Sequence, residues 1–325
     1  MKTRRHVLTL AAAALAAPAI PKFARAQAWP SRGPIRVIIP FSAGSTVDVI
    51  GRIVLDPLSQ RLGQTMVIEN RGGAGGSIGS AAVAKADPDG YTLLVNASAH
   101  SAAPAVYPNL SYDPSGDFAA VVPFGSVPNV IVISPAKGIK TVKELAEKAK
   151  ASGQMTFSSA GVGSATHWAA ERFRVAAGFQ GTHVPFRGGP EALTEVMTGR
   201  VDWCAIGITS GLPFIKQNTL IPLAVCSPQR TPALADVPTT LEAGFADSDY
   251  IFWNGLLAPA KTPPDVVNRL REETIKVLDT AEVKAKFAPQ GIDPMPMSSA
   301  DFGALIKKEI ESNKKVAQAA GLKFN

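Results

Sequence analysis

Apolar, β-branched runs alternate with amphipathic stretches along most of the chain. Such alternation predicts strands that alternate with helices. The N-terminal part gives the order βαβαβ, which favours a parallel sheet with right-handed crossovers. The predicted elements here are strands 35–40, 65–70 and 91–96 and helices 47–62 and 77–86.

A second series of the same kind follows. Thr141 and Glu144 form a capping box at the start of one of its helices. The predicted elements are strands 130–134, 155–159, 183–186, 201–206 and 220–226 and helices 141–151, 165–177, 190–198 and 212–218.

The C-terminal part has a different pattern, which predicts long amphipathic helices at 263–278 and 301–319. Helices without a sheet of their own must pack on one already built, so the pattern favours two α/β lobes with a returning C-terminal segment. Pro and Gly interrupt the pattern at residues 122–128 and 250–259, where we expect the chain to cross between the lobes. We expect these crossings to act as a hinge that lets the lobes close on a ligand. The predicted boundaries are 27–127 plus 253–325 for lobe 1 and 128–252 for lobe 2.

The first 26 residues have the features of a cleaved export signal. A basic start is followed by the apolar run 7–17, the breaker Pro21 and an A-x-A site at Ala24–Ala26. The run is too short to span a membrane. The pair Arg4-Arg5 fits a twin-arginine signal or an ordinary basic start. We therefore expect a mature periplasmic protein that begins near Gln27.

Composition excludes several classes of protein. With 46% hydrophobic and 18% charged residues, the chain is neither a disordered tail nor a coiled coil. Five of the 33 basic residues lie in the leader, which leaves 28 against 26 acidic residues, so no nucleic-acid surface is expected. Cys204 and Cys226 each lie in an apolar run, which favours two buried thiols over a disulfide. The scattered histidines and absence of a cysteine cluster predict no metal and no organic cofactor.

Three Gly-rich loops join a predicted strand to a predicted helix, at 40–48, 69–79 and 158–167. A helix start presents unpaired N–H groups and partial positive charge, and glycine lets a ligand approach the backbone. The first and third loops fall in different lobes. Two such helix starts facing each other across a cleft would suit a small carboxylate or dicarboxylate.

Other interpretations of these loops are structural or catalytic. Ser45 with Asp48, and Ser164 with His167, have the spacing of helix caps. Ser164 and His167 could instead be a nucleophile and its base in a secreted α/β hydrolase-like enzyme. The second loop has the spacing G-x-G-x-x-x-G from Gly73 to Gly79, whereas the dinucleotide-binding motif is G-x-G-x-x-G. It also follows the second predicted strand rather than the first, which argues against a nucleotide site. His100 fits either the cleft or the core.

The candidate ligand site combines both helix starts with residues at strand ends. The predicted ligand-binding residues are Phe41, Ala43, Gly44, Ser45, Thr46, Gly75, Ser98, His100, Gly161, Gly163, Ser164, Ala165, His167, Phe186, Thr209 and Ser210. Among these, we expect N–H groups at 44–46 and 163–165 to hold the carboxylates. Arg187 could pair with a carboxylate or lie exposed.

Several ordered motifs together match one known family. They are 40–48 with Arg52, 69–79, Asp87-Pro88-Asp89-Gly90 with 91–94, 161–167, 183–188, 236–244, 253–255 and 258–259. With these motifs the chain resembles the extracytoplasmic solute-binding proteins of tripartite tricarboxylate transporters, the Bug family. The resemblance implies a periplasmic type II binding-protein fold with a hinged cleft. It also implies carboxylate ligands held by backbone amides and ordered water, and delivery to a large and a small membrane subunit. We expect a monomer.

Two positions depart from the pattern of that family. Ser45 stands where a second glycine is usual, and Phe186-Arg187-Gly188 replaces the usual Y-K-G. Both changes bear on which carboxylate fits. A carboxylate sensor that feeds a signalling partner is an alternative to transport.

Overall fold

The computed structural model describes residues 29–319. The predicted leader lies outside the described residues. Lobe 1 begins with three strands and two helices in the predicted order, and the strands pair in parallel as β2-β1-β3, which confirms the first βαβαβ prediction. These elements are β1 (Ile35–Ile39), α2 (Thr46–Leu62), β2 (Met66–Asn70), α3 (Ser77–Ala84) and β3 (Thr92–Ala97).

A further helix, α4 (Ala99–Val106), follows β3 and was not predicted. It is short, rich in small residues and contains Pro104, so it lacks the polar face that marks an amphipathic helix. Ser98 joins it directly to the end of β3. This places the start of α4 at the carboxyl end of a parallel strand.

Lobe 2 contains the second series, again in the predicted order. Its strands β5, β6 and β7 pair in parallel, and α8 begins four residues before its predicted start. The elements are α5 (Val142–Ser152), β5 (Thr156–Ser159), α6 (Ala165–Ala177), β6 (Thr182–Pro185), α7 (Gly189–Met197), β7 (Trp203–Gly207), α8 (Ile208–Lys216) and β8 (Ile221–Cys226). Short 3₁₀ turns lie at Ala74–Gly76, Pro135–Lys137, Pro232–Leu234 and Ala288–Gln290.

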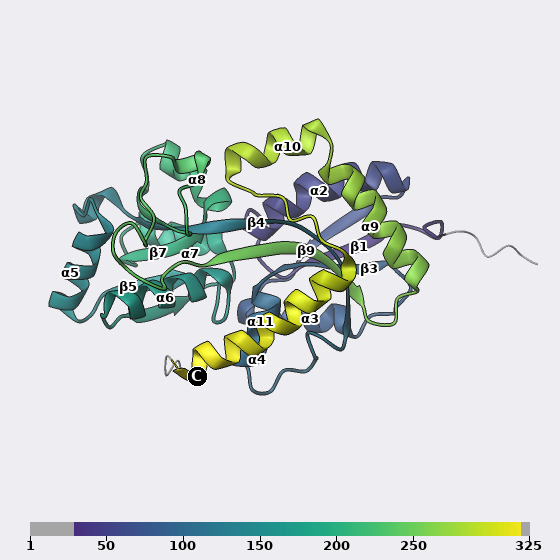
Figure 1. Cartoon of the computed structure of the whole chain (residues 1–325), viewed down its shortest axis with the longest axis horizontal. Coiled ribbons are helices and arrows are strands. Elements are labelled where there is room, and N and C mark those ends of the chain that lie inside the picture. Colours follow the sequence, from purple (N-terminus) through teal and green to yellow (C-terminus); the bar gives the residue numbers. More distant parts are fainter. Residues whose placement is uncertain (1–28, 320–325) are drawn as a thin grey trace, which may run out of the picture.

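Two long strands, β4 (Phe118–Ile133) and β9 (Ile251–Pro259), connect the lobes (Figure 1). They pair with each other antiparallel, and the full order is β2-β1-β3-β9-β4-β7-β5-β6, with β8 on β4. The pattern of Pro and Gly had suggested chain crossings at these segments but not regular strands. Two register shifts in β4, near Val122 and near Pro123–Gly125, let a strand that contains proline stay paired. The sheet is therefore parallel in each lobe and antiparallel at its centre.

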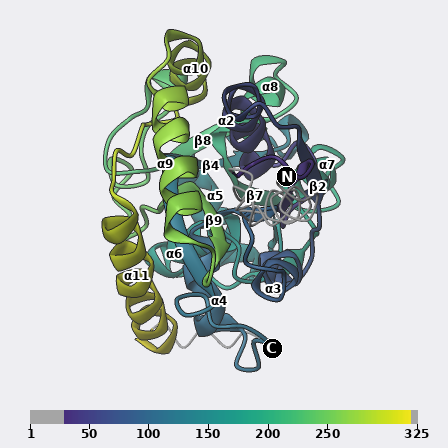
Figure 2. The ribbon, with the colours of Figure 1, turned by 90° about the vertical axis from the view of Figure 1, so that its right-hand side faces the viewer.

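The C-terminal helices α9 (Pro264–Leu278), α10 (Ala281–Phe287) and α11 (Ser299–Ala319) run along one side of the molecule (Figure 2). The two long helices were predicted, whereas α10 was not. Glu309 on α11 accepts hydrogen bonds from Trp253 Nε1 at 2.8 Å and from Ser101 Oγ at 2.5 Å, which ties α11 to β9 and α4. Burial raises the pKa of Glu309.

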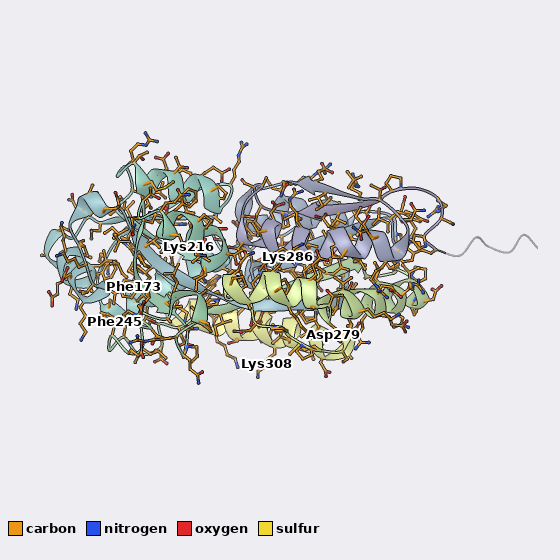
Figure 3. The ribbon with its side chains drawn as sticks, turned by 90° about the horizontal axis from the view of Figure 1, so that it is seen from above. Phe173, Lys216, Phe245, Asp279, Lys286 and Lys308 are labelled. Atoms are coloured by element: carbon orange, nitrogen blue, oxygen red, sulfur yellow. The ribbon has the colours of Figure 1, made fainter. Side chains whose placement is uncertain are left out.

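The core is apolar in both lobes. In lobe 2, Phe173 packs edge-on against Phe245 with 5.2 Å between ring centroids (Figure 3). Cys204 and Cys226 are free and fully buried, and burial raises the pKa of both thiols to about 12. This confirms the prediction of two buried thiols. Within the described residues, no helix combines the length and the apolar character that crossing a bilayer requires.

Candidate ligand site between the lobes

A narrow cavity of about 30 Å³ lies where the two lobes meet. Both predicted helix starts contribute to it, α2 from lobe 1 and α6 from lobe 2. Its lining consists of Phe41, Ser45, Thr46, Val47, Ala97, Ala99, Ala160, Ser164, Ala165, Thr166, Gly189, Ile206, Ser210 and Phe252. None of these side chains is charged.

The loop before α2 is a capped helix start. Gly44 has a left-handed φ of 77°, and Ser45 Oγ accepts the N–H of Asp48 at 3.3 Å. The Asp48 carboxylate turns back to accept the N–H of Gly44 at 2.9 Å, and it also accepts from Arg52 Nε and Asn70 Nδ2. Burial raises the pKa of Asp48, but these hydrogen bonds outweigh it, and the net pKa lies below its ordinary value. The cap interpretation of Ser45 and Asp48 is confirmed.

The loop before α6 has the same design with a different side chain. Gly163 also has φ of 77°, and Ser164 Oγ accepts the N–H of His167 at 3.2 Å. His167 Nδ1 accepts the N–H of Gly163 at 3.1 Å, so this nitrogen carries no proton. Burial holds the pKa of His167 well below its ordinary value, helped by His183, whose ring stacks on it at 3.9 Å, and by Arg174.

These two loops decide which N–H groups can face a ligand. The N–H groups of Gly44 and Ser45, and of Gly163 and Ser164, bond within their own loops, so our expectation that they hold the carboxylates is wrong for these four groups. The third N–H of each helix is capped by serine. The first two remain, because the helix itself offers them no acceptor. They belong to Thr46 and Val47 in α2 and to Ala165 and Thr166 in α6.

Three further helix starts converge on the same cavity. Ala99 opens α4, Gly189 opens α7, and Ser210 lies in the first turn of α8. Ser210 Oγ also reaches across to lobe 1, 3.0 Å from Thr46 Oγ1 and 3.2 Å from the Gly44 carbonyl oxygen. Helix starts carry partial positive charge, so these starts favour an anion in the cavity without any cationic side chain.

Six of the predicted site residues line this cavity: Phe41, Ser45, Thr46, Ser164, Ala165 and Ser210. Ala43, Gly44, Gly163 and His167 form the two loops behind it. Thr209 lies next to Ser210 and is 5% exposed, and its hydroxyl has no partner among the described residues.

The other predicted residues lie elsewhere. Ser98 Oγ accepts the N–H of Trp253 at 3.1 Å and so anchors β9. His100 is a core residue: its Nε2 lies 2.9 Å from the carbonyl oxygen of Pro114, its ring packs on Phe118, and burial lowers its pKa to about 4. Between the two alternatives for His100, the structure shows the core.

Gly75, Gly161 and Phe186 lie at the mouth of the cleft. Gly75 packs so closely on Val162 that a side chain at Gly75 would collide with the Val162 carbonyl oxygen. Gly161 and Phe186 line an open groove there, together with Arg187 and Tyr107. Tyr107 donates to the Val162 carbonyl oxygen at 2.7 Å, and Ser42 donates to Glu191 at 2.6 Å. These hydrogen bonds join the lobes on the rim of the cavity.

Sequence reasoning found Phe41 and Ala165 but missed most of the apolar lining. Phe252, Ala97 and Ile206 lie on strands, and nothing in their identity distinguishes them from core residues. Thr166 could have been found, because it occupies the first turn of a predicted helix. Gly189 follows the motif at 183–188 and directly precedes the predicted helix 190–198.

The geometry does not assemble Ser164 and His167 into a nucleophile–base pair. Ser164 Oγ accepts the backbone N–H of His167 and lies 2.9 Å from Thr166 Oγ1, while His167 Nδ1 takes the N–H of Gly163. Both side chains thus act in the helix start. Residues 29–319 contain no group of three His, Cys, Asp or Glu side chains that could hold a metal ion.

Comparison with known proteins identifies relatives of the whole chain. The model of the tripartite tricarboxylate transporter family receptor matches residues 50–322. A UPF0065 protein of Agrobacterium vitis is 36% identical over 312 residues, 94% of this chain and 90% of the relative. Protein BugT of Bordetella pertussis is 31% identical over 318 residues, 97% of this chain and 96% of the relative.

Solved structures share the fold at similar identity. One described as a periplasmic transporter has a TM-score of 0.88 at 36% identity and covers 92% of this chain and all of its own. A Rhodopseudomonas palustris protein solved with adipate has a TM-score of 0.86 at 30% identity, covering 90% and 98%. MatC of the same organism, solved with malate, has a TM-score of 0.84 at 29% identity, covering 88% and 99%. The two-lobed binding-protein fold predicted from the sequence is confirmed.

Proposed function

The chain belongs to the tripartite tricarboxylate transporter receptor family, and on this premise we propose that it captures a small organic carboxylate between its two lobes. Members of this family are periplasmic solute-binding proteins, which supports binding as the role of this chain. The proposal goes further, to the chemistry of the ligand and to the groups that hold it.

The observation that supports it most is the composition of the interlobe cavity. Five helix starts meet there, and no lining side chain is charged. A cation would gain nothing from such a site, and a neutral molecule would leave the helix N–H groups without strong acceptors. Backbone N–H groups at a helix start bind carboxylate oxygens well.

The arrangement favours a ligand with two carboxylates, and because the cavity as it stands has only about 30 Å³, the lobes would open to admit it. One would accept from Thr46 and Val47 of α2, and the other from Ala165 and Thr166 of α6. Ser45, Ser164 and Ser210 would add or orient hydroxyl contacts. The apolar walls, such as Phe41 and Phe252, would pack against the carbon chain. The relatives solved with malate and with adipate hold dicarboxylates of different lengths, which supports the class without choosing a member.

We propose that binding is coupled to movement of the lobes and precedes delivery to a large and a small membrane subunit in the periplasm. β4 pairs with β9 as far as Pro128 and with β7 and β8 from Asn129 onward. This change of partners supports a hinge at that point, with lobe 1 as 27–127 plus 253–325 and lobe 2 as 128–252. Solution scattering with and without a ligand of measured affinity tests it, and identical profiles would contradict closure.

The site is tested by placing one charge at a helix start. Ala165→Asp puts a carboxylate beside the first N–H of α6, whereas Ala165→Asn adds nearly the same bulk without charge. We expect Ala165→Asp to bind the best ligand of a mono-, di- and aromatic carboxylate panel at least about tenfold more weakly than Ala165→Asn. Titration calorimetry measures both.

Lys143→Asp is the matched control, because it adds an acid to the start of α5, away from the cavity. It should leave affinity unchanged. Equal affinities for Ala165→Asp and Ala165→Asn would refute this site. Recovery of the ligand with unchanged mass is expected, and a chemically altered ligand would point to the enzyme alternative instead.

A further inference from the structure

A second concave site lies in lobe 1 between α9, β4 and the segment 294–298, and it shares no lining residue with the interlobe cavity. Its volume is about 470 Å³, within the range of small-molecule sites. The floor is formed by Val122 and Phe124 of β4. Ile275 and Leu278 of α9 form one wall, and Met295 and Met297 form the other. We call this site the α9 groove.

The wall that carries the methionines is fixed at both ends to β4. Asp293 and Ser126 exchange backbone hydrogen bonds of 2.8 and 2.9 Å just before it. Just after it, Ser299 Oγ donates to the carbonyl oxygen of Val121 at 2.6 Å. The groove is therefore built into the fold rather than formed by a loose loop.

One cation in the α9 groove lacks a protein partner. Arg271 Nε is buried, and no acceptor for it lies among residues 29–319. The other cation of the rim, Lys284, is neutralised by Asp279 at 2.5 Å; Figure 3 labels Asp279 at the end of α9. Arg271 lines the groove, is partly exposed and forms no ion pair among residues 29–319, so its guanidinium is available to an anionic ligand.

We propose that the α9 groove binds a small monoanion with an apolar body, of the chemical class of a medium-chain monocarboxylate. Its carboxylate pairs with the Arg271 guanidinium, which offers a forked set of donors. Its hydrocarbon part lies on Ile275, which is 38% exposed, and on the partly buried Met295 and Met297, whose flexible side chains adapt to apolar ligands. A single charge is favoured, because Arg271 is the one cation of the groove that its neighbours do not neutralise.

This site differs from the interlobe cavity in the source of its positive charge. The interlobe cavity has helix starts and no charged side chain, whereas the α9 groove has the Arg271 guanidinium in addition to the start of α11, which Ser298 caps at the edge of the groove. The two sites should therefore respond to different substitutions. Failure of one leaves the other untouched.

Octanoate is the probe for the test, with octanol as its uncharged counterpart. Calorimetry on the mature protein should show octanoate binding that Arg271→Gln weakens by about tenfold or more. Arg269→Gln is the matched control, because Arg269 lies on the same helix, pairs with Glu273 at 3.7 Å and does not line the groove. It should change the affinity by less than about twofold.

Crystals grown with 8-bromooctanoate locate the bound probe by the anomalous signal of bromine. Bromine density over Met295 and Met297 is the expected result. Density in the interlobe cavity alone, or equal octanoate affinity in wild type and Arg271→Gln, would overturn the proposal. Octanol binding as tightly as octanoate would also overturn it, since the groove would then be an apolar docking surface without anion recognition.

Discussion

The loops that precede α2 and α6 have nearly the same backbone. Gly44 and Gly163 share a φ of 77°, and the serines that follow have φ of −65° and −66°. In each loop the third helical residue accepts the N–H of the glycine, but that residue is Asp48 in lobe 1 and His167 in lobe 2. One loop is held by an anion paired with Arg52, and the other by a neutral ring.

The difference shows that the backbone geometry, not the charge of the supporting group, is what the two helix starts have in common. Either acceptor leaves the same two N–H groups facing the cavity. Charge still matters for the ligand, because an anion at the start of α2 offsets part of the helix dipole. Substitutions in the two loops can separate the effect of geometry from that of charge.

The two glycines should differ in their tolerance of a side chain. A Cβ on Gly163 would lie 3.1 to 3.3 Å from three atoms of Val106, whereas a Cβ on Gly44 would meet only Pro190, at 3.6 Å. Both substitutions strain a left-handed backbone, so Gly44→Ala should cost about 1 kcal/mol of unfolding free energy. Gly163→Ala should cost about 3 kcal/mol, because crowding adds to the strain.

Urea unfolding measures both losses. Gly178→Ala is the control, since Gly178 is left-handed at the other end of α6 and has open space around its Cβ. It should behave like Gly44→Ala. Equal losses for Gly44→Ala and Gly163→Ala would contradict the crowding by Val106.

Acid should weaken the loop of lobe 2 before that of lobe 1. Burial lowers the pKa of His183, which stacks on His167, to about 4 from 6.5. Because the pKa is lower in the folded protein, neutral His183 contributes fully to the free energy of unfolding above pH 6.5. This contribution is lost as the pH falls to 4. The loss amounts to about 3 kcal/mol. The pKa of Asp48 lies below 3.8, so Asp48 stays charged across this interval.

Unfolding free energies at several pH values between 7 and 4 test this contrast. His183→Gln removes one titrating group and should flatten the pH dependence, whereas Asp48→Asn should leave its slope unchanged. The same slope in wild type and His183→Gln would show that His183 does not titrate as the structure implies.

The two serine caps should contribute about equally to stability. Ser45→Ala and Ser164→Ala each leave one helix N–H without its acceptor, which costs about 1 kcal/mol. Thr141→Ala, at the cap of α5, should lose a similar amount but bind ligand normally. Calorimetry would reveal a flaw in the site if Ser164→Ala lowered ligand affinity no more than Thr141→Ala does.

The charge of Asp48 should produce the smallest effect, and it should have the opposite sign. Asp48→Asn keeps an acceptor for Gly44 but removes a negative charge beside the proposed carboxylate and releases Arg52. We expect ligand affinity to rise by a few fold, about 0.5 to 1 kcal/mol at low salt. Asp265→Asn, in the first turn of remote α9, should change nothing. Weaker binding by Asp48→Asn would show that loop geometry at α2 depends on the anion after all.

Local sequence was enough to predict those features of this protein that depend on contacts between neighbouring residues. Helix caps form between residues three apart, so the spacing of Ser45 with Asp48 and of Ser164 with His167 was enough to predict both helix starts. Periodicity likewise predicted most strands and helices and their alternation, because buried and exposed positions repeat along each element. The ordered motifs were enough to identify the family.

The contacts between these elements could be seen only in the folded structure. Pairing of β9 between β3 and β4 brings Phe252 to the cavity from far along the chain, and no local pattern encodes such a contact. The same holds for Ser210 beside Thr46, for His100 in the core rather than the cleft, and for Arg271 facing the methionines of 294–298. These contacts join residues that are distant in the sequence, so they depend on how the elements pack and not on the spacing of residues along the chain.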